Sequence, residues 1–159
     1  MPTTTAIPQD HPRGYMFGTN VGTLDGACDA SVGRRDVTDA SPSWTWAAGN
    51  AVSTVADLTI WVRSLATGAL LSAATQAERV KALETAPQSS VRYGLHIGNF
   101  AGMMGHDGAL PGFQTFLGYI PARNATIVVT ANMYVDSTCG SPADTIVKLL
   151  MKELGLLAP

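Results

Sequence analysis

The sequence predicts an α+β fold in which an antiparallel sheet is covered by helices. Helical periodicity comes first, strand-like apolar runs follow it, and a capped amphipathic segment closes the chain. Consecutive strands that follow helices, rather than alternate with them, are typical of this class. We expect one partial domain over residues 1–159, with a loop-rich lead-in at 1–47, a helical segment at 48–90, antiparallel strands at 91–135 and the closing helix at 141–155.

The lead-in contains one predicted strand, Tyr15–Val21, and then a long stretch rich in Gly, Asp, Ser and Ala from Gly22 to Ser43. Loops of this length are uncommon within compact domains and tend to be functional or mobile. We therefore expect a long surface excursion before the first helix.

Two helices are predicted in the helical segment. Ser53 or Thr54 is a suitable N-cap for the first, with Asp57 completing a capping-box-like start. Gly68 supplies the C-terminal stop. The second helix is expected over Ala73–Leu83.

Three strands are predicted next, over Arg92–Ile97, Gln114–Ile120 and Thr126–Ala131. Pro121–Asn124 has the composition of a turn between the last two. Ser141 and Pro142 then open the closing helix as cap and first-turn proline. Its expected buried stripe consists of Ala143, Ile146, Val147, Leu150 and Leu154.

The composition excludes several classes of function. Apolar residues make up 46% of the chain, charged residues only 14%, and the formal net charge is −2. This charge gives no electrostatic reason to expect nucleic acid or an anionic membrane as a partner. No apolar run is long enough for a transmembrane helix, and Met1–Thr5 lacks the basic and apolar regions of a signal peptide.

The most informative stretch is Gly105-His106-Asp107-Gly108, which is followed by Ala109-Leu110-Pro111-Gly112. Three glycines in eight residues indicate positions where φ is positive or another chain segment comes close. A histidine and an acid between such glycines are typical of an exposed edge that receives another group. The alternative is a glycine-rich hairpin with one solvated histidine.

The order of the segments around this stretch resembles a known family. Trp46–Leu58, Leu70–Ser72 and Tyr93–Leu95 precede the stretch, and Phe113–Ile120 follows it. The succession resembles the C-terminal half of the serine β-lactamase and penicillin-recognising family, particularly class C β-lactamases, DD-carboxypeptidases and related esterases. The resemblance extends from about Pro8 to Leu154. It implies the C-terminal part of the β-lactamase/transpeptidase-like fold.

Two motifs of that family are absent from the sequence. No serine has a lysine three positions later, and no tyrosine is followed by Asn or Ser at the second position. In the family both motifs, Ser-x-x-Lys and Tyr-x-Asn, lie upstream of the matched region. We therefore expect the second half of a hydrolase, which is inactive alone and associates with the missing N-terminal half or with itself.

The resemblance implies catalytic roles for three residues. His106 would supply a polarisable charge near the catalytic base and the substrate. Gly108 would let the substrate backbone lie against the strand that lines the cleft. The backbone N–H of Ala109 would be one of two oxyanion-hole donors, the other belonging to the absent serine.

Two further residues are candidates for substrate binding. Asp107 stands where the family has a hydroxyl, and an ionised carboxylate only accepts hydrogen bonds and repels anions. This favours an ester, an amide or an amidated peptide as substrate, unless Asp107 instead orients His106 or caps a turn. Trp44 is either a wall of the substrate cleft or a cover for the helix that starts near Ser53.

No metal and no cofactor is expected. His11, His96 and His106 lack the spacing that zinc sites use. Ser53 and Ser72 precede helices as caps and have no base nearby in sequence, so neither is expected to be a nucleophile. The two cysteines, Cys28 and Cys139, allow one disulfide or two free thiols.

The sequence thus predicts the C-terminal portion of an acyl-serine hydrolase that acts on a small molecule or peptide with a reactive acyl group. By resemblance, the parent protein works outside the cytoplasm, in the periplasm or as a secreted protein. Two alternatives stay open. One is a non-catalytic binding or interaction module on the same fold, and the other is an ordinary esterase.

Overall fold

The computed structural model describes residues 7, 10–18, 28, 31–81 and 91–156. Much of the predicted lead-in, including Gly22 and the end of the strand predicted to reach Val21, lies outside the described residues, as do 82–90 of the helical segment. The elements are β1 (Tyr15–Met16), β2 (Arg35–Asp36), η1 (Ser43–Thr45), α1 (Val55–Thr67), α2 (Ala73–Lys81), β3 (Val91–Tyr93), β4 (Gly98–Phe100), β5 (Met103–Leu110), β6 (Phe113–Ile120), η2 (Pro121–Arg123), β7 (Ala125–Ala131) and α3 (Pro142–Glu153).

These residues fall into two units. The first consists of Met1–Ser53, Gly108–Thr115 and Thr130–Ile146, and the second of Thr54–Asp107, Phe116–Val129 and Val147–Pro159. Strands β3 to β7 form one sheet in which each strand lies beside its neighbour in sequence. The α+β class predicted from the sequence is confirmed.

The sheet contains two strands that the hydrophobic pattern did not predict, β4 and β5. The strand predicted over Arg92–Ile97 is wrong beyond Tyr93. The chain turns there, with Gly94 N–H donating to the Ile97 carbonyl at 2.7 Å. His96 occupies the turn at φ 56°. Residues 105–110 of the glycine-rich stretch lie on β5, and the family resemblance implies a strand at this place.

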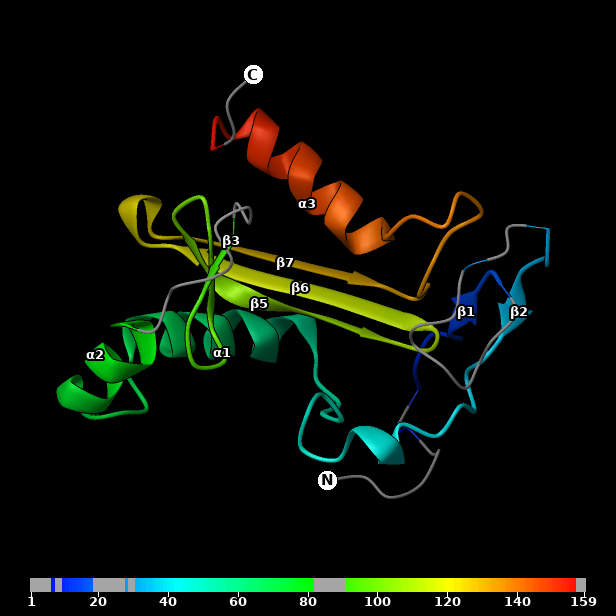
Figure 1. Ribbon diagram of the computed structural model, residues 1–159, viewed down its shortest axis with the longest axis horizontal. Coiled ribbons are helices and arrows are strands. Elements are labelled where there is room, and N and C mark those ends of the chain that lie inside the picture. The colour runs from blue at the N-terminus through cyan, green and yellow to red at the C-terminus, as the bar shows by residue number, and fades with distance from the viewer. Residues whose placement is uncertain (1–6, 8–9, 19–27, 29–30, 82–90, 157–159) are drawn as a thin grey trace. The chain divides into compact units, whose positions relative to one another are not determined.

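Helix α1 begins as its sequence predicts. Thr54 is the N-cap, its hydroxyl accepting from the backbone N–H of Asp57 at 3.1 Å. Gly68 ends the helix in the left-handed conformation at φ 75°. On one face of α1, fully buried Val62 packs with Leu117 and Tyr119 of β6, and this cluster forms a core of the second unit. Figure 1 shows α1 running along one side of β6.

Helix α2 has no buried residue, but it fixes the β3–β4 turn through Arg79. The Arg79 guanidinium donates to the carbonyls of Leu95 at 3.1 Å and His96 at 3.2 Å. Partial burial of this guanidinium lowers its pKa from the usual value. The contact positions the turn that follows Tyr93.

Helix α3 begins after Ser141, whose hydroxyl accepts from the Asp144 N–H at 3.3 Å. Its buried side chains are Ala143, Val147 and Met151, which recur every fourth residue. The predicted stripe is therefore wrong for Ile146, Leu150 and Leu154, whose side chains are about 40% exposed (43%, 40% and 39%). The face of the helix that is buried is therefore centred on Ala143, Val147 and Met151, and not on the stripe that periodicity predicted.

In the first unit, a buried glutamine of β6 holds the start of α3. The side-chain oxygen of Gln114 accepts from the Ser141 hydroxyl at 2.9 Å and from the Ala143 N–H at 3.0 Å. Its amide nitrogen donates to the Tyr134 carbonyl. Tyr134 in turn donates its N–H to the carbonyl of Tyr15 in β1 at 2.8 Å. Gln114 thus joins three segments that are distant in sequence.

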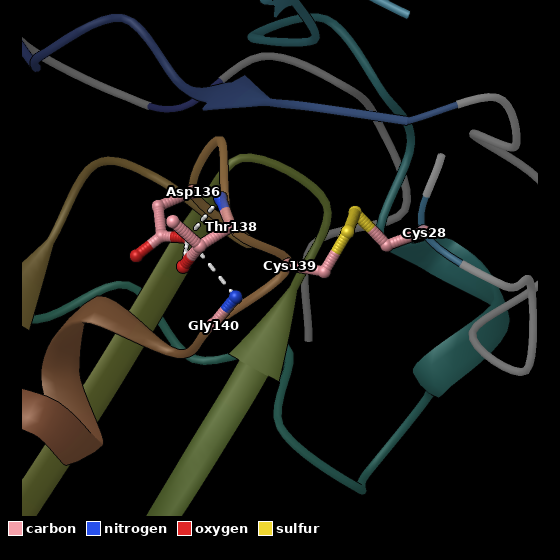
Figure 2. Close-up of a disulfide and its surroundings, with 5 residues drawn as sticks. All are labelled: Cys28, Asp136, Thr138, Cys139 and Gly140. Atoms are coloured by element: carbon pink, nitrogen blue, oxygen red, sulfur yellow. Dashed lines mark hydrogen bonds between the residues drawn. A yellow bond between two sulfur atoms is a disulfide. The ribbon is translucent and has the colours of Figure 1, made fainter. Parts of the chain in front are cut away.

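The two cysteines form a disulfide between Cys28 and Cys139, with Cα atoms 5.6 Å apart (Figure 2). The turn before Cys139 is built on Asp136. One carboxylate oxygen of Asp136 accepts from the Thr138 N–H at 2.8 Å, the Thr138 hydroxyl at 2.7 Å and the Gly140 N–H at 3.0 Å. These bonds, the Thr138 hydroxyl foremost, hold the pKa of Asp136 below its usual value.

Candidate active site

The candidate site is the second half of β5. Strand β4 pairs with β5 only through Gly98–Gly105, Asn99–Met104 and Phe100–Met103. The sheet places β5 between β4 and β6 alone, so β5 from His106 onward has no strand partner on the β4 side among the described residues. An unpaired strand edge presents backbone N–H and C=O groups to an incoming chain. The exposed edge expected from the sequence lies here.

The glycines of this strand serve different purposes. A Cβ at Gly105 would collide with the carbonyl oxygen of Leu117 in the neighbouring β6, so Gly105 is required by close backbone approach. Gly112 ends the β5–β6 turn at φ 86°. At Gly108, by contrast, a Cβ would meet no described atom within 4 Å. Gly108 therefore leaves open space above an exposed part of the strand.

Gly112 also fixes where β5 ends. A Cβ at this position would lie 2.9 Å from the Cα atom of Gly14, which precedes β1. A Cβ at Gly14 would in turn lie 2.6 Å from the ring of Phe113. The two glycine backbones therefore approach each other closely within the first unit.

Both ring nitrogens of His106 have partners within the chain. Nδ1 bonds to the backbone carbonyl of Asp107, and Nε2 bonds to the hydroxyl of Tyr93. A carbonyl only accepts, so Nδ1 is the donor, and in the neutral imidazole Nε2 accepts from the Tyr93 hydroxyl. The two rings also meet edge to face, with centroids 5.5 Å apart and an interplanar angle of 72°.

Asp107 is exposed and does not orient His106 through its carboxylate. The distance from its Oδ1 to His106 Nδ1 is 3.8 Å, which is longer than a hydrogen bond. The backbone carbonyl of Asp107 makes the contact instead. The carboxylate acts at longer range, on Tyr93. The pKa of Tyr93 is raised above its usual value, chiefly by burial and secondly by the negative charge of Asp107.

The other two candidates are exposed. Ala109 follows Gly108 on the open part of β5. Trp44 lies in η1 of the first unit with 56% of its surface exposed, and Trp46 beside it is 69% exposed. A role for Trp44 in substrate binding stays a prediction.

Tyr93 received no role from the sequence, although it belongs to one of the segments that carried the resemblance. The strand register places it close to His106, one row away. Tyr93 lies opposite Gly98, and Gly98 lies opposite Gly105, so two glycines stand in the row beside the tyrosine. The glycines Gly94, Gly98 and Gly105 could have indicated that Tyr93 lies near His106. Using them would have required knowing that β4 lies between β3 and β5.

In the part of the chain that the structure describes, no group of three or more His, Cys, Asp or Glu side chains could hold a metal ion.

His96, expected within a strand, lies in the β3–β4 turn. Ser72 caps α2 by accepting from the Thr75 N–H at 3.2 Å. None of the described helices is both long enough and apolar enough to cross a membrane.

Comparison with known proteins gave the following. A family model described as Beta-lactamase matches residues 2–148. No curated protein matches the sequence. Among solved structures, a D-stereospecific amidohydrolase from Streptomyces sp. is similar, with a TM-score of 0.68 and 22% identity over 83% of this chain and 38% of that chain. A penicillin binding protein from Bacillus halodurans has a TM-score of 0.58 and 17% identity over 92% of this chain and 42% of that chain. The chain thus spans about two fifths of either protein, and the likeness to both is one of fold.

Proposed function

Because this chain belongs to the beta-lactamase family, we propose that it is the C-terminal portion of a penicillin-recognising serine hydrolase. In this proposal the chain supplies the strand that lines the cleft, together with part of the oxyanion hole. The nucleophile comes from a polypeptide that carries Ser-x-x-Lys and Tyr-x-Asn, which this sequence lacks. Alone, the chain is inactive.

The observation that carries the proposal is the open half of β5. Its edge has no strand partner beyond Gly105 among the described residues, and Gly108 adds no side chain to the space above it. A substrate with an extended backbone fits against such an edge. The same stretch carries the histidine and the exposed Ala109 that the family resemblance singled out.

The proposed mechanism is acylation of the serine followed by hydrolysis of the acyl-enzyme, two steps that replace one difficult step. The N–H of Ala109 stabilises the charge that develops on the acyl oxygen, a contribution of roughly 3 kcal/mol in measured cases. In this proposal His106 supplies a polarisable charge near the catalytic base and the substrate. The proposal involves no diffusible cofactor.

Asp107 selects the substrate class in this proposal. Its side chain is 56% exposed and carries no hydroxyl to donate to a carboxylate. Anionic substrates are therefore disfavoured, and an ester, amide or amidated peptide is preferred. The similar Streptomyces protein is a D-stereospecific amidohydrolase, which agrees with an amide as substrate.

The parent protein is proposed to work outside the cytoplasm. Disulfides such as Cys28–Cys139 persist in oxidising compartments and are rare in the cytosol.

Acylation by a fluorescent penicillin tests the proposal. The chain is purified with the polypeptide that carries the two missing motifs, fused or supplied in trans, and labelling is read after denaturing electrophoresis. We expect labelling that disappears when the motif serine is replaced by alanine. Within this chain, Ala109→Pro removes the N–H and should slow labelling about 100- to 1000-fold, whereas Ala109→Ser retains the N–H and should label normally.

A folded complex that binds penicillin without becoming acylated would favour the second candidate, a non-catalytic binding module. Asp107 in place of the hydroxyl is the observation that favours this alternative. Hydrolysis of short p-nitrophenyl esters without action on D-Ala-D-Ala peptides would instead identify an esterase of the same fold.

A further inference from the structure

We propose that Tyr93 is the positioning residue of His106, holding its imidazole in one orientation beside the open half of β5. The inference rests on the proposed function, because it assigns to Tyr93 the task of presenting a residue of that site. Tyr93 lies on β3, two strands away from β5 in the sheet. Its contact with His106 therefore exists only in the folded chain.

The geometry gives each ring nitrogen of His106 a defined partner. The backbone carbonyl of Asp107 requires a proton on Nδ1, which leaves the lone pair of Nε2 to accept from the Tyr93 hydroxyl. The Asp107 carbonyl thus sets the tautomer, and the Tyr93 hydroxyl on the other ring nitrogen opposes a ring flip. The edge-to-face contact between the rings adds a second restraint on orientation.

The surroundings keep Tyr93 in this position. Its opposite neighbour in β4 is Gly98, where a Cβ would lie 2.6 Å from the ring of Phe100. The turn that follows is closed by the Gly94–Ile97 hydrogen bond and held by Arg79. The Tyr93 ring is thus supported independently of its hydroxyl, and Tyr93→Phe removes the hydrogen bond while keeping the ring.

The test measures the imidazole nitrogens of this chain by long-range proton–nitrogen correlation NMR, which needs no enzymatic activity. In the wild type we expect His106 in the Nδ1–H tautomer with the Nε2 signal shifted by the hydrogen bond from Tyr93. In Tyr93→Phe the Nε2 signal should move toward that of an unbonded imidazole nitrogen, while Nδ1 keeps its proton. Tyr119→Phe is the matched control. It removes a tyrosine hydroxyl of the same unit, bonded to Asn124 at 3.1 Å, and should leave the His106 signals unchanged.

An Nε2–H tautomer in the wild type would overturn the proposal, and so would identical His106 signals in the wild type and Tyr93→Phe. Should Tyr93→Phe fail to fold, a wild-type Nε2 signal at the position of an unbonded imidazole nitrogen would overturn the proposal, and a shifted signal would support it. Where the acylation assay works, Tyr93→Phe should lower the acylation rate about five- to tenfold with little change in substrate affinity. Failure of the acylation assay with the expected tautomer would contradict the proposed function but not the His106–Tyr93 pair.

Discussion

Removal of the Cys28–Cys139 disulfide should destabilise the chain chiefly through its unfolded state. The bond joins residues 111 positions apart, so it closes a long loop in the unfolded chain. Chain entropy for a loop of this length corresponds to about 4.8 kcal/mol at 25 °C, and native disulfides typically contribute about 2–5 kcal/mol when removed. We therefore expect the double variant Cys28→Ser/Cys139→Ser to lose about 2–5 kcal/mol of unfolding free energy.

The native structure around Cys139 gives a reason to expect the entropic cost to dominate. Three hydrogen bonds to one Asp136 oxygen hold the turn independently of the sulfur atoms (Figure 2). The turn should therefore persist when the bond is removed. The released unfolded chain should also expose more surface, which raises the slope of the denaturation curve.

Urea denaturation followed by circular dichroism measures this loss. The wild type in a reducing agent is the matched control, because it breaks the bond without changing either side chain to serine. It should coincide with the double variant. An unchanged midpoint in both samples would refute the reasoning, and a loss well above 5 kcal/mol would show that the bond supports the native structure directly.

Three further outcomes are expected. Gly105→Ala should lose about 1–3 kcal/mol of stability in thermal unfolding, because its Cβ would collide with β6, whereas Gly108→Ala should be within about 1 kcal/mol of the wild type but weaken substrate binding. Gln114→Met should lose about 3 kcal/mol in urea denaturation, because it leaves the buried N–H of Ala143 and other groups without their partner; a loss below 1 kcal/mol would contradict this role. The phenolate absorbance of Tyr93 should titrate above the ordinary pKa of about 10, and Asp107→Asn should lower this pKa without restoring the ordinary value, because burial is the larger cause. Since the folded state holds this proton more tightly, the free energy of unfolding should fall as the pH rises above about 10 and through the folded pKa; titration at or below 10 would contradict the burial of Tyr93.

The candidate site shows where sequence reasoning succeeded and where it stopped. The glycine pattern correctly indicated a close backbone approach at Gly105 and a positive φ at Gly112. It also indicated an exposed edge near His106, which the structure has. It did not identify Tyr93. A contact between β3 and β5 depends on the register of β4, which lies between them and is only three residues long.

The sequence by itself determined the features that depend on neighbouring residues. The N-cap at Thr54, the stop at Gly68 and the start of α3 after Ser141 follow from local hydrogen bonds and backbone conformation, so a short window of residues is sufficient. The α+β class followed from the order of helical and strand-like segments, and the family followed from the order of its motifs.

The tertiary structure alone decided the features that depend on distant residues. It paired Cys28 with Cys139, rotated α3 so that Met151 is buried, and turned the chain at His96. It also brought the Tyr93 hydroxyl to the imidazole of His106. Each of these outcomes is set by the packing of segments far apart in sequence, whose contacts do not exist until the sheet has formed.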